Sequence, residues 1–556
     1  MPLSPSQRKL AELSRDRQFL IRGVVVILAV CIILGFVLAK FAKTGRSEEE
    51  SKELLVQSII SYDSERDRDE LSNLLLQRGA PTPEAIAENI RFISVFIEHN
   101  LLERSKLDRE AVLAKVPIYE SAQLAIEGAR SHLTEEQRIL FHNYAIALYK
   151  EGDEQLEAFG FLGEQAEVRP PVRFANEFLG HVLSRQAGQR AEALPHFQLE
   201  ADTFPRSDFS RFQLLNLNLA LGDHDALRRL LADDSYSKLA SPQFQTELGI
   251  ELRDPLVILK GVARADLEDF SSPVLPLSLF AGLIWFIVLA KLGGVERLPS
   301  RQVVLFALCL VAGFLSATFT LLLVVWQDNV LGFSLNGDFV NDLLYCFAAI
   351  GLREEFAKIL FFLPFVPFIA KRCTQVEILI AAGCVGLGFA TSENINYFYG
   401  PGGSPASALP RLLTASFLHI SLTGLLGLAI CRFWHYPKRC WEEAVGTFVA
   451  VVFVHGLYDA LLIVRELAEL GGILSIVVLA LTVREFFRKI FATRTTPRQI
   501  VSPLAVFVLG SAMVVGAAWI FAMYYYDLDT ALDGVGRGAL GSAILAFIYI
   551  NEMRDE

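Results

Sequence analysis

Gly351-Leu352-Arg353-Glu354-Glu355-Phe356-Ala357-Lys358-Ile359-Leu360 places four charged residues between two strongly apolar segments. Residues 343–350 and 359–366 are apolar, so the whole run is long enough to cross a bilayer. An ionisable side chain inside a membrane helix costs at least ~2.5–3.5 kcal/mol, which makes it a candidate functional group. On a helix, Lys358 can reach Glu354 or Glu355. A single acid would indicate helix packing or gating, whereas this cluster indicates a functional site.

The composition indicates a membrane protein. The chain has 556 residues, of which 53% are hydrophobic. The net charge is −11, and no basic stripe with interleaved aromatic residues is present, so nucleic acid is not an expected partner. The seven cysteines include no C-x-x-C pair, and none lies within 44–272. The sequence therefore indicates neither a disulfide framework nor a cysteine-rich zinc site.

The apolar segments predict an all-α, polytopic helical bundle of about ten spans. An N-terminal segment at 19–42 reads as an uncleaved signal anchor, because it is long and no small-x-small cleavage site follows it. The other segments lie at 273–292, 302–326, 339–370, 376–398, 409–431, 444–464, 471–491, 501–524 and 536–551. The last of these is short and contains Asn551.

Five regions follow from these patterns. We expect a cytoplasmic N-terminus at 1–18, the transmembrane anchor at 19–42, an extracytoplasmic helical domain at 44–272, a membrane core at 273–491 and a transmembrane hairpin at 492–556. The chain is thus predicted to combine a membrane bundle with one large domain outside it.

The 44–272 region is charged, Gln-rich and amphipathic, with no run long enough to span a membrane. Glycines recur at spacings of 36 and 34 residues, at Gly152, Gly188 and Gly222. Ala193, Phe197 and Pro205 then follow at offsets similar to those of a tetratricopeptide repeat, over roughly 138–235. The resemblance implies an α-helical solenoid that binds a protein partner on its concave face. An irregular helical domain is the alternative.

The connecting loops predict the topology. Basic residues gather in alternate loops, at Arg297 and Arg301; Lys371 and Arg372; Arg432, Lys438 and Arg439; and Arg484, Arg488, Lys489, Arg494 and Arg498. The intervening loops are poor in them. The positive-inside rule then places both termini in the cytoplasm and 44–272 outside. We expect a multi-pass protein of a bacterial inner membrane, with the lipid bilayer as its environment.

Further polar residues interrupt later spans. Glu393 and Asn394 lie in 376–398, and His419 lies in 409–431. His455 and Asp459 lie four residues apart in 444–464, on one helical face. Alone, a histidine could be an interhelical hydrogen-bonding residue, and Glu393 near a helix end could reach the interface. Together, on successive spans, these groups predict a shared polar pocket, because each is costly in hydrocarbon without a partner.

The pocket's composition suggests activation of water. An ionised carboxylate can take a proton from water, and two histidines with a carboxylate can stabilise an oxyanion or bind a divalent metal such as zinc. The possible ligands are His419, His455, Glu393 and Asp459. No H-E-x-x-H motif is present. Both a metal-bound and a glutamate-activated water remain open.

The ordered set of motifs resembles the PrsW family of intramembrane proteases, which are relatives of the CAAX prenyl endopeptidases and the bacterial CPBP proteins. The set comprises Glu354-Glu355-x-x-Lys358, Phe389-x-x-x-Glu393-Asn394, His419 and His455-x-x-x-Asp459, on consecutive spans. The resemblance covers about 270–490. It implies hydrolysis of a membrane-anchored protein, as in the prototype, which cleaves an anti-sigma factor on its outer side. The large outer domain departs from a minimal family member.

The resulting assignment is an intramembrane peptidase core at 273–491. We expect Glu354, or less readily Glu355, to be the water-activating base, and Lys358 to keep the pair ionised. His419 and His455 would stabilise an oxyanion or bind a metal, and Asp459 would orient His455. Glu393 and Asn394 would add a second carboxylate and an amide.

Two other functions use the same residues. A transporter or membrane sensor could use buried Glu, Lys and His as an ion or proton relay, although the membrane region has no evident inverted repeat. A scaffold with an inert pocket is the other alternative, which the complete motif set disfavours.

Overall fold

The computed structural model describes residues 4–40, 82–96, 118–186, 188–269, 274–295, 300–399, 409–412, 414–493, 500–525 and some residues within 528–547. Throughout these residues the regular structure is helical and contains no strand, which confirms the predicted all-α class. The chain divides into two compact units, residues 1–42 with 259–556, and residues 43–258.

The first unit contains eight described helices that are long and apolar enough to cross a membrane. They are α2 (Arg17–Ala39), α18 (Leu275–Leu292), α19 (Arg301–Val330), α23 (Gln375–Tyr399), α25 (Ala415–His435), α26 (Pro437–Ile463), α27 (Ala468–Thr493) and α28 (Pro503–Tyr525). The short helix α1 (Pro5–Leu13) precedes α2. The chain is therefore a multi-pass membrane protein. Most of the predicted span at 536–551 lies outside the described residues.

The predicted span at 339–370 is segmented rather than continuous. It consists of α20 (Phe339–Leu344), a π-helical segment (Tyr345–Gly351), α21 (Leu352–Phe362), a 3₁₀ turn (Leu363–Phe365) and α22 (Val366–Arg372). Pro364 and Pro367 lack the backbone N–H that a regular helix uses, which explains the break after α21. Short π-helical segments are rare and frequently accompany functional sites. Here one leads directly into the Glu-Glu-x-x-Lys turn.

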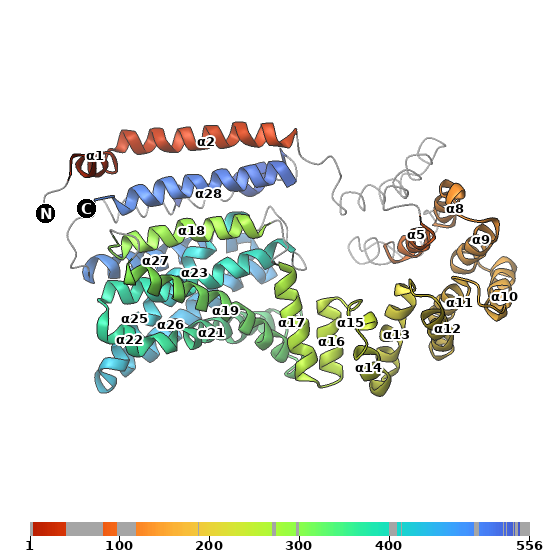
Figure 1. The fold of residues 1–556 in the computed structure, drawn as a ribbon. Helices are drawn as coiled ribbons and strands as arrows, with labels where there is room; N and C mark the ends of the chain where they lie inside the picture. The colour runs from red at the N-terminus through yellow and green to blue at the C-terminus, as the bar shows by residue number, and fades with distance from the viewer. Residues whose placement is uncertain are drawn as a thin grey trace. The chain divides into compact units, whose positions relative to one another are not determined.

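Helix α23 is the central element of this unit. It packs against α18, α19 and α25, and nearly all of its spanning window is buried. The N-terminal helix α2 packs against α28, which in turn packs against α18, so segments from the two ends of the chain lie side by side (Figure 1). This arrangement encloses the polar residues of α21, α23, α25 and α26 among apolar helices.

A glycine brings α26 close to the π-helical segment. A Cβ atom built on Gly456 would lie 2.7 Å from Cα of Phe347 and 2.8 Å from the carbonyl oxygen of Cys346. No larger side chain fits without moving one backbone away from the other. Because Gly456 follows His455, this contact also sets how near that imidazole comes to α21.

The second unit is a succession of helices (Figure 1). They are α5 (Pro83–Phe96), α8 (Ile118–Gly128), α9 (Glu135–Tyr149), α10 (Asp153–Glu167), α11 (Ala175–Arg185), α12 (Arg190–Thr203), α13 (Asp208–Leu221), α14 (His224–Leu231), α15 (Asp234–Ser237) and α16 (Pro242–Glu251). Helix α17 (Pro255–Asp269) crosses the boundary between the units.

Consecutive helices from α8 to α14 pack against one another. The three recurring glycines all adopt positive φ, and Ala193 and Phe197 are fully buried. A buried ion pair joins Arg91 to Glu177 at 2.7 Å. These features agree with stacked helix pairs, while membership of the tetratricopeptide class stays a prediction.

We predict that Gly456→Ala destabilises the membrane unit by roughly 1–3 kcal/mol, the usual cost of overpacking. Gly472→Ala is the matched control, because it also lies in a membrane helix and its Cβ would meet nothing within 4 Å. The control should be neutral or stabilising by up to about 1 kcal/mol. Thermal unfolding of the full chain in detergent measures both. Equal midpoints for the two variants would contradict the close approach.

Candidate intramembrane active site

Lys358 lies at the centre of the polar cluster. Its side chain is fully buried, and Nζ lies 2.8 Å from Oε1 of Glu355 and 3.4 Å from Oε2 of Glu354. The same ammonium donates to Nδ1 of His419 at 2.8 Å and lies 4.0 Å from the ring centroid of Phe389. A buried charge without such partners would be strongly destabilising. The helical spacing predicted from the sequence thus brings both acids to one lysine.

His455 reaches the two acids from α26. Its Nδ1 atom lies 2.8 Å from Oε1 of Glu355, and its Nε2 atom lies 3.5 Å from Oε2 of Glu354. Asp459, one turn further along α26, approaches the same Nε2 atom at 3.3 Å, without hydrogen-bond geometry. Glu355 therefore contacts Nδ1 of the His455 ring, and Glu354 and Asp459 lie near Nε2.

His419 enters from α25 and completes the cluster. Its ring lies edge-on to that of His455, with 5.1 Å between the ring centroids. While Nδ1 faces Lys358, Nε2 hydrogen-bonds to Oε2 of Glu393 on α23 at 2.9 Å. Each histidine thus has one nitrogen bound to a carboxylate, while the other nitrogen faces Lys358 in His419 and faces Glu354 and Asp459 in His455.

The two adjacent glutamates differ in how many close contacts their carboxylate oxygens make. Glu355 is completely buried, and besides Lys358 and His455 it accepts a hydrogen bond from Thr423 at 3.4 Å. Glu354 keeps 7% of its surface exposed and, among the residues that the structure describes, makes only the two longer contacts. Glu354 is consequently the less constrained carboxylate.

Residues 300–486 match the family model described as PrsW family intramembrane metalloprotease. All the residues of the cluster lie within this range. The match supports an intramembrane protease. Curated proteins and solved structures both lack a significant match to the chain. The anchor helix α2, the second unit and α28 lie outside the PrsW match.

The PrsW-matching core contains a group that could hold a metal ion. Donor atoms of Glu354, His419 and His455 all lie within 4.8 Å of one another. Two imidazoles with one carboxylate are a donor set that zinc accepts. The carboxylates bound to the two histidines also fit a metal site, because a metal-binding histidine usually donates its second N–H to a carboxylate. Glu355 and Glu393 occupy those positions on His455 and His419. A metal bound by His419 would use Nδ1, the nitrogen that accepts from Lys358 in this structure, so metal binding requires the ammonium to move away.

The sequence had placed Glu393 and Asp459, rather than Glu354, among the possible ligands. In the structure Glu393 binds the outer nitrogen of His419, and Asp459 lies beside His455 with one oxygen that has no hydrogen-bond partner. Asn394 differs from the other predicted residues: its Nδ2 donates to Oγ of Ser416 at 3.4 Å, and its buried Oδ1 has no hydrogen-bond partner among the described residues. The remaining predicted residues form one continuous network.

Arg411 is a site residue that the sequence analysis did not identify. Its Nη2 lies 3.1 Å from Oε2 of Glu393, the oxygen that also binds His419. Its guanidinium lies 3.4 Å from the ring centroid of Tyr397. Arg411 therefore holds Glu393 against His419. The available signal was that 399–411, otherwise free of basic residues, ends in this arginine.

We predict that Arg411→Gln weakens zinc binding by the full chain about 10-fold, the lower end for loss of a histidine's own partner, because Arg411 acts on His419 through Glu393. Arg411→Lys should restore part of the affinity, because it keeps the charge but loses the planar stacking on Tyr397. Arg439→Gln, on the exposed start of α26, is the control. Competition with a zinc-binding dye measures the affinity. Unchanged affinity in Arg411→Gln would show that Arg411 does not position His419.

Proposed function

We propose that this chain is an intramembrane peptidase that hydrolyses a membrane-anchored protein at the Glu354–His419–His455 cluster. The supporting observation is that these three groups converge on one space inside the membrane unit. Each imidazole is held there by a carboxylate that hydrogen-bonds to one of its ring nitrogens. Such preorganisation favours chemistry at the centre over a purely structural ion pair.

The two acids have different roles in this proposal. Glu354 engages the attacking water, because it retains exposure and its oxygens are the less occupied. Glu355 holds Lys358 and His455 in place. Lys358 places its ammonium against both carboxylates.

His419 and His455 face the space where the carbonyl oxygen of the scissile bond would gain charge. Glu393 and Arg411 fix the orientation of His419, Glu355 fixes that of His455, and Asp459 places a second carboxylate beside the same ring. In the alternative in which a metal activates the water, Glu354, His419 and His455 would hold a divalent metal such as zinc, and Glu354 would then be a ligand instead of the base. When bound, the metal would polarise the carbonyl and lower the pKa of water.

The outer domain would select substrates. Its stacked helices suit binding of a protein partner. The loop charges favour cytoplasmic termini in a bacterial inner membrane, with 44–272 outside. The resemblance to the PrsW prototype suggests a membrane-anchored regulator, such as an anti-sigma factor, as the substrate class.

A proton or ion relay is the second candidate. The contacts run without interruption from Glu393 through His419 and Lys358 to Glu355 and His455. Buried chains of this kind carry protons in pumps and transporters. A relay predicts no cleavage of any peptide.

We predict that Glu354→Gln lowers the cleavage rate of a membrane-anchored reporter by at least ~10²-fold, the lower range for loss of a general base, with little change in unfolding temperature. Glu355→Gln should lower both activity and stability, because it leaves Lys358 and His455 without their closest partner. The reporter should carry many candidate sequences, and full-length protein in liposomes should be used.

Glu442→Gln is the control, since this acid lies exposed near the start of α26. Cleavage at the wild-type rate by folded Glu354→Gln would contradict its assigned role. Absence of cleavage by the wild type, together with proton flux that depends on Glu354, would favour the relay.

A further inference from the structure

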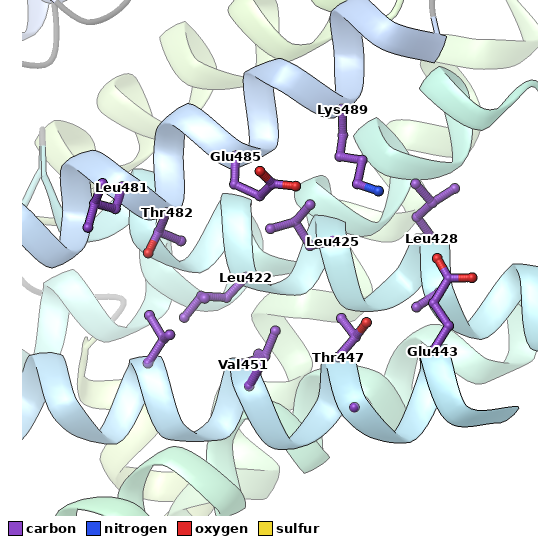
Figure 2. A pocket seen from close by; sticks show the side chains of 14 residues that line it. Leu422, Leu425, Leu428, Glu443, Thr447, Val451, Leu481, Thr482, Glu485 and Lys489 are labelled. Carbon is purple, nitrogen blue, oxygen red and sulfur yellow. The ribbon is translucent and has the colours of Figure 1, made fainter. Parts of the chain in front are cut away.

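A groove separate from the polar cluster lies between α25, α26 and α27. Its volume is about 510 Å³, within the roughly 300–1,000 Å³ of small-molecule sites. Leu422 and Leu425 of α25, Val451 of α26 and Leu481 of α27 form much of its wall (Figure 2). All three helices are among the membrane-spanning candidates, so these walls belong to the apolar part of the protein.

Charged side chains gather toward one end of the groove, which we term the mouth. It lies where α25 and α27 end and α26 begins, and Glu443 and Lys489 project there from α26 and α27 (Figure 2). Although opposite in charge, these two side chains form no ion pair with each other within the described part of the chain. The groove is therefore apolar along its length and bipolar at its mouth.

Two arginines near the mouth pair with its glutamates. Arg432 donates to Oε1 of Glu443 at 2.7 Å, and Arg488 binds both oxygens of Glu485 at 2.7 Å. The second oxygen of Glu443 has no contact in the described residues, and a carboxylate can accept several hydrogen bonds. One cationic donor and one anionic acceptor are thus available for a ligand.

The groove also has free space beside α26. A Cβ atom built on Gly446 would meet no atom within 4 Å. Helix α26 therefore presents a small residue to the groove without using it for helix packing. Gly456 on the same helix differs, because the neighbouring backbone leaves no room for a side chain there.

We propose that this groove binds one phosphatidylethanolamine molecule. An acyl chain lies along the apolar walls, the phosphate accepts from Lys489, and the ammonium donates to the second oxygen of Glu443. A zwitterionic headgroup supplies both charges in one ligand. It also matches the position of the mouth, at the end of the helices where a headgroup would lie.

A substrate helix fits these observations less well. A spanning helix is about 30 Å long and about 10–12 Å wide, far larger than this groove. The flank of a membrane helix on the side of the basic loops is usually rich in Lys and Arg, which would face the ammonium of Lys489.

The binding site is distinct from the proposed peptidase chemistry and does not depend on it. The groove nevertheless lies against α25 and α26, the helices that carry His419 and His455. Leu422 and Val454, which line the groove, are the chain neighbours of Thr423 and His455. A bound lipid would therefore support the packing of α25 and α26 next to the polar cluster.

The test measures phosphatidylethanolamine binding to full-length protein in detergent by native mass spectrometry. Phosphatidylglycerol and phosphatidylcholine of the same acyl chains are the comparison lipids. Lys489→Gln and Glu443→Gln should each weaken phosphatidylethanolamine binding about tenfold, as expected for loss of one charge-assisted hydrogen bond. Lys438→Gln and Glu442→Gln, which carry the same charge changes outside the groove lining, should leave binding unchanged.

Gly446→Leu provides an independent variant, because a Cβ there meets no atom within 4 Å, the rest of the side chain would enter the groove, and leucine should improve helix propensity. It should abolish binding while retaining the unfolding temperature. Wild-type lipid occupancy in Gly446→Leu would overturn the proposal. Equal affinity for phosphatidylglycerol would overturn the headgroup assignment. Crosslinks from a photoreactive residue at 446 to a membrane protein instead of lipid would identify a helix as the occupant.

Discussion

The ion pair between Lys358 and Glu355 is the interaction on which the polar centre depends. Both side chains are completely inaccessible, and Nζ lies 2.8 Å from the carboxylate oxygen. Charges in such an environment are tolerated only with good geometry and further hydrogen bonds. Those additional bonds come from His419, His455 and Thr423, on two other helices. The need to satisfy one buried pair therefore determines how three helices meet.

Close helix packing makes these contacts possible. Gly456 lets α26 approach the π-helical segment that precedes α21, and Gly386 lets α23 meet the backbone of α25 at His419. The two glycines thus place both histidines within reach of α21. Preorganised groups in a site that excludes bulk water are the arrangement expected for electrostatic catalysis. The close helix contacts consequently also set the geometry of the site.

Much of this centre was predictable because polar residues stand out in apolar spans. The helical period indicated that Lys358 would meet either acid and that His455 and Asp459 would share a face, and the structure confirms both contacts. Arg411 was not predictable, since its partner Glu393 lies on a different element and Arg411 follows a stretch of sequence rich in Gly, Ser and Pro. Periodicity also could not indicate that Glu355 contacts Nδ1 of His455, which depends on the rotation of α26 about its axis. The break of 339–370 was signalled only by its prolines.

Isotope-resolved mapping of the cleavage products tests the hydrolytic role of the cluster most directly. The purified chain would be incubated with a membrane-anchored reporter in water enriched in ¹⁸O, and the fragments analysed by mass spectrometry. Hydrolysis predicts a new C-terminus that has gained ¹⁸O from the solvent. An intact reporter in the presence of correctly folded wild-type protein, across a broad set of sequences, would contradict it.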